Sequence, residues 1–362
     1  METEIYRSSA SSSSIEKCGS YSEDADDHIL WNVGDLICNN RYIVRRMLGK
    51  GTFGTVLEVI DSKDRSIKAL KVVRPGTCIK EAKKEEANLT RLNILDPNGE
   101  KGVVRLCNSF RLDHHYCLVV DKLGKSLFDL IKRNDYRGFN MWEIQNYTYQ
   151  VLITLEFLHS HGIAHTDLKP ENILFVRDSY QFDRNRRQYK SNVLDVRLID
   201  YGGATFPEQY HTTTVNTRHY RAPEILLRNG WDHTSDIWCL GCILVELYTG
   251  NMLFPIFDDY SHLALIVKLL GHIPLKMVKA CGALIRKYFT KQYRLNWPQL
   301  NNSHKLLRVV NRALFIEDLI GSEHQEFVHL VYSMLRLMPS RRITAAQALR
   351  HPFFQRDYSS YK

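Results

Sequence analysis

Long apolar runs are missing from this chain of 362 residues. No stretch approaches the roughly 18 to 20 consecutive apolar residues that a membrane-crossing helix requires, so the sequence predicts no membrane span. The first residues, Met1 to Glu4, also lack the basic-then-apolar pattern of a secretory signal peptide. We therefore expect a protein that works away from the membrane.

Regularly spaced cysteine pairs are lacking as well. The eight cysteines are scattered along the chain, which indicates reduced thiols in an intracellular protein rather than a disulfide framework. Cys239 and Cys242 have the CxxC spacing of a zinc site, but they lie in an apolar run over 236–245 and no second ligand pair accompanies them. Two buried helix thiols are the simpler interpretation, and a zinc site is the alternative.

Nucleic-acid-binding motifs are also absent. The net charge is +9, yet the basic residues are dispersed and do not alternate with aromatic residues. We expect a surface that attracts phosphate-rich ligands without direct binding of nucleic acid. With 44% hydrophobic residues the chain is able to bury a full core, and its length predicts two domains or one bilobal unit.

The N-terminal region is poor in aliphatic residues. Residues 1 to about 28 are rich in serine and acidic residues, with a run of small polar residues from Ser8 to Ser14. Such a composition buries too little apolar surface to offset the entropy of ordering. We expect residues 1–36 to be a disordered tail and lead-in, which either carries regulatory phosphorylation sites or is inert.

Beyond the tail the sequence predicts an α+β fold with two parts. Residues 37–124 carry β-rich runs and one charged helical stretch, and residues 125–354 have apolar residues at helical spacing. Residues 355–362 form a C-terminal tail. The predicted strands are 42–48, 55–60, 67–73, 103–112 and 116–120, and the clearest predicted helices are 79–92, 142–159, 235–247 and 324–337.

A glycine-rich turn separates the first two predicted strands. Residues 48–56 read LGKGTFGTV, a GxGxxGxV pattern. Glycines let a turn approach phosphate groups closely, and its backbone N–H groups donate to them. The pattern alone is weak, but a strand rather than a helix follows it, which argues against dinucleotide binding. The candidate phosphate-binding residues are Leu48, Gly49, Lys50, Gly51, Thr52, Phe53, Gly54, Thr55 and Val56.

Ala69 and Lys71 lie on the next predicted strand, on one face of it because side chains alternate. A strand lysine is usually a surface residue, but the upstream glycine-rich turn favours a phosphate-binding role for Lys71. We expect Lys68, on the other face, to be solvated.

Lys71 needs a carboxylate from the following helix, and both Glu85 and Glu86 are candidates. Choosing Glu85 places Leu89 and Leu92 at i+4 and i+7, where the helix must present an apolar face. Choosing Glu86 places polar residues there. We therefore favour Glu85.

The densest group of reactive residue types is at 165–172 (HTDLKPEN), followed by 200–202 (DYG). An Asp with a Lys two residues later and an Asn five residues later, then Asp-aromatic-Gly, resembles the catalytic loop and metal-binding motif of eukaryotic protein kinases. Either motif alone is weak, but the ordered set with the glycine-rich turn is specific. The resemblance covers residues 42–354 and implies the bilobal kinase fold, with a small antiparallel β lobe that carries one helix and a larger, mostly helical lobe.

The resemblance implies Mg-ATP as co-substrate and a role for each motif residue. Asp167 would orient the attacking hydroxyl, and Lys169 would neutralise the moving phosphoryl group. The candidate catalytic residues are Asp167, Lys169, Asn172 and Thr217, and the candidate metal ligands are Asn172 and Asp200. Ala69, Val120, Asp121 and Leu123 would surround or hydrogen-bond the adenine, and Lys71 would bind the α- and β-phosphates.

Three further residues resemble the architectural residues of a kinase. Residues 217–224 (TRHYRAPE) would close the activation segment. Asp236, on the buried helix, would accept backbone N–H bonds from the catalytic loop. Glu224 needs a buried cationic partner, for which Arg342 is the candidate.

Finer features resemble the LAMMER (Cdc-like) family of the CMGC group. They are the loop HTDLKPENILFV at 165–176, GAT at 203–205 and TRHYR at 217–221. The signature that names the family falls at 261–274, where only part of it survives. The family carries an insert between the first two of these motifs, so the resemblance implies that residues 177–190 form a hairpin, whose basic residues are either a nuclear-import signal or a solvated loop.

Thr166 stands where most kinases have an arginine. That arginine normally receives an activation-loop phosphate and orders the loop. We therefore expect activity that does not depend on an upstream kinase, with autophosphorylation on Tyr and Ser/Thr as the family resemblance implies.

The resemblance implies protein substrates, namely Ser/Arg-rich splicing factors, and hence a nuclear protein, with the cytoplasm as alternative. We expect a monomer. A basic enzyme needs local carboxylates for basic substrates, and the candidates are Glu171, Asp258, Asp259 and the acidic segment 23–27. Two rival interpretations are another CMGC kinase with different substrates and a pseudokinase scaffold, although the main catalytic residue types are all intact.

Overall fold

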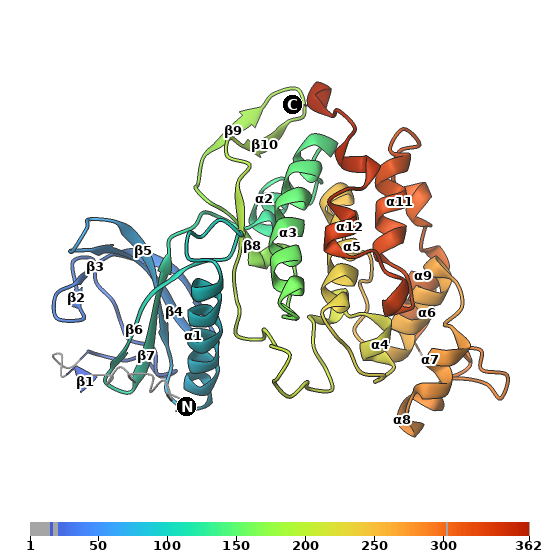
Figure 1. Cartoon of the computed structure of the whole chain (residues 1–362), viewed down its shortest axis with the longest axis horizontal. Coiled ribbons are helices and arrows are strands. Elements are labelled where there is room, and N and C mark those ends of the chain that lie inside the picture. Colours follow the sequence, from blue (N-terminus) through green and yellow to red (C-terminus); the bar gives the residue numbers. More distant parts are fainter. Residues whose placement is uncertain (1–14, 17–20, 302, 362) are drawn as a thin grey trace, which may run out of the picture. The chain divides into compact units, whose positions relative to one another are not determined.

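The computed structural model describes residues 15–16, 21–301 and 303–361, which divide into two compact units. The first unit ends at Lys122 and the second takes over at Leu123, apart from the short stretch 98–103 that belongs to the second. The α+β fold with one β-rich and one helical part, predicted from the sequence, is confirmed (Figure 1).

The first unit is built on a seven-stranded sheet with the order β1-β6-β7-β5-β4-β3-β2. Neighbouring strands are antiparallel except for β1 and β6, which run parallel. The strands are β1 (Ile15–Glu16), β2 (Leu36–Ile37), β3 (Tyr42–Gly51), β4 (Gly54–Asp61), β5 (Ile67–Val73), β6 (Leu106–Leu112) and β7 (His115–Asp121).

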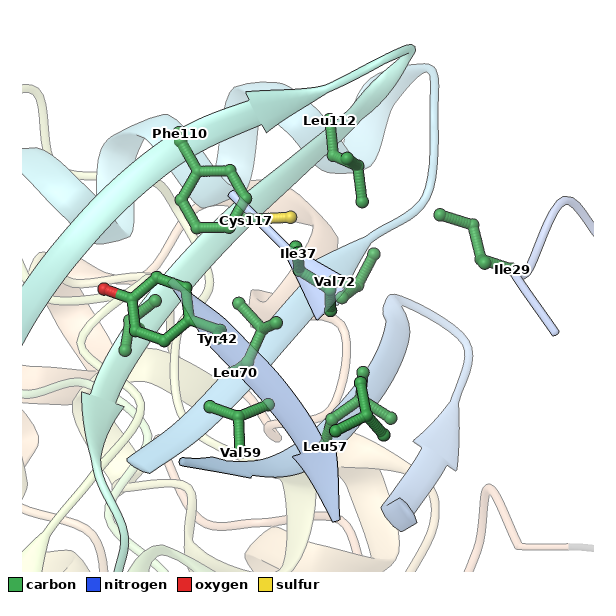
Figure 2. Close-up of a cluster of buried hydrophobic side chains, with 12 residues drawn as sticks. Ile29, Ile37, Tyr42, Leu57, Val59, Leu70, Val72, Phe110, Leu112 and Cys117 are labelled. Atoms are coloured by element: carbon green, nitrogen blue, oxygen red, sulfur yellow. The ribbon is translucent and has the colours of Figure 1, made fainter. Parts of the chain in front are cut away.

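Helix α1 (Thr77–Leu95) covers one face of this sheet (Figure 1). Its buried residues include Leu89 and Leu92, which follow Glu85 at the predicted helical spacing. The other face carries a core of alternating apolar side chains from β3 to β7, in which Leu57, Leu70 and Val72 gather (Figure 2). Alternation along each strand thus gives the sheet two apolar faces.

The segment before β3 corrects the prediction of a disordered tail over residues 1–36. Within the described residues 21–36, Ile29 is buried in the sheet core, and Ile37 follows it there (Figure 2). Tyr21 packs against Trp31 with ring centroids 5.2 Å apart. Burial of these few large apolar side chains orders the segment, although its acidic composition predicts disorder. The remainder of the predicted tail, 1–14 and 17–20, lies outside the described residues.

The second unit is mostly helical, and a few short strands accompany the helices. The helices are α2 (Leu127–Arg133), α3 (Met141–Ser160), α4 (Pro223–Leu226), α5 (Thr234–Thr249), α6 (Asp259–Leu270), α7 (Leu275–Ala280), α8 (Ala283–Arg286), α9 (His304–Arg312), α10 (Ile316–Leu319), α11 (Gln325–Met334) and α12 (Ala345–Ala348). The strands are β8 (Ile173–Phe175), β9 (Tyr180–Asp183), β10 (Gln188–Ser191) and β11 (Val196–Leu198).

Helix α5 is the centre of this unit, because it is buried on every side from Ser235 to Leu247. Cys239 and Cys242 lie inside it as core thiols, and the Cys239 thiol donates to the carbonyl oxygen of Tyr220 at 3.2 Å. Strands β9 and β10 form the hairpin expected for the insertion. Among the described residues, no helix is both long and apolar enough to cross a membrane.

Candidate active site

The glycine-rich turn joins β3 to β4, with Gly51 opposite Gly54 and Lys50 opposite Thr55. Gly54 has a φ of 149°, and a Cβ atom there would lie 2.0 Å from the carbonyl oxygen of Val72, so only glycine fits. A Cβ atom at Gly49 or Gly51 would meet no atom within 4 Å. These two glycines therefore keep space open beside the turn instead of packing against protein, as a phosphate-binding loop requires.

On β5, Lys71 pairs in register with Val56 of β4 and Leu118 of β7. Its Nζ donates to Oε2 of Glu85 at 2.6 Å. The neighbouring Glu86 accepts from the hydroxyl of Tyr116 at 2.5 Å, on a different side of α1. Helical periodicity thus identifies the carboxylate that the structure pairs with Lys71.

Lys68, on the opposite face of β5, was expected to be solvated, and this prediction was wrong. Its Nζ donates to Oδ1 of Asp121 at 3.0 Å, and the Lys68 side chain is only 18% exposed. Hydrogen bonding to Asp121 outweighs burial and raises the pKa of Lys68. Val120 and Asp121 end β7, opposite Ala69 and Lys68, so this pair fixes the end of the strand, and Leu123 opens the second unit.

In the second unit, Asp236 of α5 anchors the catalytic loop. Its carboxylate accepts from the backbone N–H groups of His165 at 2.8 Å and Thr166 at 2.9 Å, and it contacts His159 Nε2 at 3.1 Å. Burial opposes ionisation of this carboxyl, but these partners outweigh it and lower the pKa of Asp236. The loop can thus hold Thr166 at the left-handed φ of 71°.

Asp167 stands at the centre of the predicted catalytic residues. Its carboxylate accepts from Lys169 Nζ at 2.5 Å and from the Thr217 hydroxyl at 2.6 Å. Asn172 Nδ2 donates to the Asp167 carbonyl oxygen at 2.9 Å. Burial opposes ionisation, yet the bonds from Lys169 and Thr217 prevail and lower the pKa of Asp167. The four candidate catalytic residues form one cluster with an ionised carboxylate in it.

Asn172 and Asp200, the candidate metal ligands, are brought together by a short ladder. Strands β8 and β11 pair antiparallel with Ile173 opposite Leu198, and the N–H of Ile199 donates to the carbonyl oxygen of Asn172 at 2.9 Å. Asp200 follows at once, with a left-handed φ of 67°. An amide oxygen and a carboxylate are ligand types that Mg²⁺ prefers, with phosphate oxygens and water completing its shell.

Tyr201, the aromatic residue of the Asp-aromatic-Gly motif, is fully buried. Its ring packs edge-on against His165 with centroids 5.0 Å apart. Burial raises the pKa of Tyr201, so the phenol stays neutral. The tyrosine therefore packs as the aromatic residue that the motif needs.

The activation segment returns to the catalytic loop through Asn216, which the sequence analysis missed. Its backbone N–H and its side-chain Nδ2 both donate to the carbonyl oxygen of Thr166, each at 2.9 Å. The guanidinium of Arg221 in turn donates to the carbonyl oxygen of Asn216 at 3.0 Å. The sequence signal that could have identified this residue is an asparagine directly before Thr217, because Asn tolerates the left-handed φ of 63° found here.

Beyond Thr217 the expected buried ion pair is present. Arg342 donates to both carboxylate oxygens of Glu224, at 2.6 and 2.5 Å, and both side chains are almost fully buried. Because a two-pronged pair of this kind is costly to break, it fixes the end of the activation segment to the helical core.

The chain matches the protein kinase domain family over residues 42–354. It is 39% identical over 345 residues to the serine/threonine-protein kinase Doa of Drosophila melanogaster, covering 92% of this chain and 41% of Doa. It is 37% identical over 349 residues to the human dual specificity protein kinase CLK2, covering 93% of this chain and 68% of CLK2. A crystal structure of a kinase domain, 34% identical, superposes with a TM-score of 0.84 over 91% of this chain and all of that domain.

Proposed function

Because the chain belongs to the LAMMER (Cdc-like) family of dual-specificity protein kinases, we propose that it phosphorylates Ser/Arg-rich proteins of the splicing-factor type, using Mg-ATP. Ser and Thr hydroxyls are the acceptors, and Tyr is phosphorylated by autophosphorylation. The observation that carries the proposal is the ionised Asp167 carboxylate held by Lys169 and Thr217. In this proposal the protein is a monomeric nuclear enzyme, and the cytoplasm is the alternative location.

In this proposal Asp167 accepts a hydrogen bond from the acceptor hydroxyl and orients its oxygen for attack. Lys169 already contacts Asp167 and places its positive charge where negative charge develops on the transferred group. Thr217 fixes the rotamer of Asp167 from the activation segment. Magnesium bound by Asn172 and Asp200 would neutralise phosphate charge.

In the first unit the proposed roles concern ATP. The glycine-rich turn, Leu48 to Val56, offers backbone N–H groups to the phosphates, and Lys71, held by Glu85, offers one cation. Ala69, Val120 and Asp121 of this unit are the residues proposed for adenine binding, together with Leu123, which begins the second unit. The open space beside Gly49 and Gly51 supports this assignment.

The proposed substrate class requires a carboxylate that can bind a substrate arginine, and several of the candidate carboxylates already have partners within the chain. Asp258 caps α6 by accepting from the N–H of Ser261, and Asp259 pairs with Arg218 at 2.7 Å. Within the segment 23–27, Asp24 pairs with Lys50. Glu171 is exposed within the catalytic loop, one residue before Asn172, and so is the best-placed carboxylate for a substrate arginine.

The test compares three peptides with purified full chain: an Arg-Ser repeat, a Lys-Ser repeat of equal charge, and a peptide of the same composition with the order scrambled. We expect the Arg-Ser repeat to have the highest kcat/KM, because a guanidinium bonds a carboxylate through two parallel N–H groups. Glu171→Gln should narrow the preference by about tenfold, the effect of losing one charged hydrogen bond. Equal rates on all three peptides would discard the substrate class and keep the kinase.

A further inference from the structure

The glycine-rich turn is contacted by an ordered segment that no kinase motif accounts for. We call residues 21–38 the N-terminal strap. Its turn is closed by a bridge between Glu23 and Ile29, with the N–H of Leu30 donating to the carbonyl oxygen of Ser22 at 2.8 Å. Ile29, in the middle of the strap, and Ile37, near its end, both anchor it in the sheet core (Figure 2). The strap is therefore a fixed part of the first unit.

Asp24 lies in the turn of the strap and has a defined orientation. Its Oδ1 accepts from the N–H groups of Asp26 at 2.9 Å and His28 at 3.0 Å. Its Oδ2 pairs with Nζ of Lys50, inside the glycine-rich turn. The bond from Lys50, with those from the two N–H groups, holds the pKa of Asp24 well below its usual range. The carboxylate is therefore ionised and aimed at the turn.

A second contact is buried. Nδ1 of His28 lies 3.3 Å from the hydroxyl of Thr55, and both residues are almost fully buried. Burial lowers the pKa of His28, so the ring is neutral and exchanges a single hydrogen bond with the hydroxyl. Because Thr55 faces Lys50 across the hairpin, the strap holds both arms of the glycine-rich turn.

Arg74 links the tip of the turn to the strap. Its guanidinium donates to the carbonyl oxygen of Asp26 at 2.8 Å, and its backbone N–H donates to the carbonyl oxygen of Phe53 at 3.1 Å. His115 Nε2 contacts the carbonyl oxygen of Asp27 at 3.0 Å from the end of the sheet. Three positions of the turn are thus tied directly or through Arg74 to one acidic segment.

We propose that the N-terminal strap positions the glycine-rich turn for ATP, with Asp24 as the positioning residue that acts through Lys50. Glycine-rich turns are intrinsically mobile, and ordering one on binding costs conformational entropy. A turn that is already held loses less entropy when a nucleotide binds, so binding is tighter. The inference rests on the proposed assignment of this turn as the site of the ATP phosphates.

The experiment is a double-mutant cycle on the full chain, with KM for ATP and kcat measured separately. Asp24→Asn keeps an oxygen for the two N–H donors and removes only the charge that pairs with Lys50. Lys50→Met removes the other partner. Asp26→Asn is the matched control, because Asp26 is exposed and its carboxylate makes no hydrogen bond or ion pair with the described part of the chain.

We expect Asp24→Asn to raise KM for ATP by about two- to fivefold with kcat unchanged, because exposed ion pairs contribute modestly. Lys50 lies in the turn itself, so Lys50→Met should raise KM at least as much. The double variant should be no worse than Lys50→Met alone, and Asp26→Asn should match the unmodified chain. The charge exchange Asp24→Lys with Lys50→Asp should recover part of the loss. In about 1 M salt, where the Debye length is about 3 Å, the differences should shrink.

Two results would overturn the proposal. One is an Asp24→Asn variant whose KM equals that of Asp26→Asn, and the other is additive effects in the double variant. A Lys71→Met variant distinguishes failure of the strap proposal from failure of the phosphate-site assignment. An active Lys71→Met variant would remove the phosphate-site assignment and the strap proposal with it. An inactive Lys71→Met variant beside an unaffected Asp24→Asn variant would remove only the strap proposal.

Discussion

At the scale of single residues, the site depends on which of two neighbouring groups faces a partner. Glu85 and Glu86 are adjacent in sequence, yet one pairs with Lys71 and the other accepts from Tyr116. A turn of about 100° per residue along a helix separates their directions. Helical phase thus decides which glutamate pairs with Lys71, and this phase can be read from the positions of Leu89 and Leu92.

Substitution of the two glutamates tests this assignment. Glu85→Gln should lower kcat/KM by about 10- to 100-fold, because a hydrogen bond to a charged group is worth about 1.5–3 kcal/mol. Glu86→Gln changes the same chemical group one residue away and should leave kcat/KM within about twofold. Steady-state kinetics of the two variants decide the matter, and equal losses in both would show that the ion pair is not what activity requires.

Glu246 is a buried carboxyl with an unusual pKa. It accepts from the Tyr220 hydroxyl at 2.7 Å, and burial, with the nearby charge of Glu171, raises its pKa to about 7. In the unfolded chain the group titrates near 4.5. The folded state therefore holds the proton more tightly, and this contribution to stability is complete below about pH 4.5 and lost as the pH rises through 7.

Removing the titration of Glu246 should change the pH profile of stability. Glu246→Gln keeps an oxygen for Tyr220 and cannot ionise, so the fall in Tm between pH 5 and pH 8 should be smaller in the variant. The difference corresponds to about 1–3 kcal/mol. Thermal unfolding of both proteins in matched buffers measures it. Identical Tm profiles would contradict the raised pKa.

At the scale of elements, the LAMMER-type signature has a packing role. Among the residues of α6 that depart from this signature are Ser261, Leu265 and Ile266, and all three are buried. His262 is buried as well, and burial lowers its pKa to about 3, so it is neutral. These side chains keep α6 packed in the core where the signature has drifted.

The activation segment is held without a phosphate. Asn216 donates twice to the carbonyl oxygen of Thr166, at the position where an arginine would otherwise receive a phosphoryl group. We infer that these neutral hydrogen bonds take the place of the charge pair that an arginine and a phosphate would form.

Phosphatase treatment tests this account. The dephosphorylated chain should keep its activity, whereas Asn216→Ala should lose about fivefold in kcat, since a neutral hydrogen bond is worth about 1 kcal/mol. Peptide phosphorylation assays before and after treatment, with mass spectrometry to verify phosphate removal, provide the comparison. Activity that vanishes on dephosphorylation would contradict the role of Asn216.

At the scale of the whole molecule, the sequence predicted the two parts, the insertion hairpin and the residues that gather around Asp167. The two parts rest on strand alternation and helical spacing, whereas the hairpin and the group around Asp167 were implied by the family that the short motifs resemble. What it missed are contacts between distant segments: Asp24 with Lys50, Lys68 with Asp121 and Asn216 with Thr166. A long-range pair between common polar residues leaves no periodic signal in the sequence. Without such a signal, the acidic composition of the strap predicted disorder.

The most direct test of the central claim is transfer of the ATP γ-phosphate by purified full chain to an Arg-Ser-repeat peptide, measured beside Asp167→Asn. In the proposed mechanism Asp167 orients the attacking hydroxyl, so we expect the variant to bind nucleotide normally while kcat falls by about 10²- to 10⁴-fold. Equal transfer by the variant, or no transfer by the unmodified chain, would contradict the assignment of this site as the centre of a protein kinase.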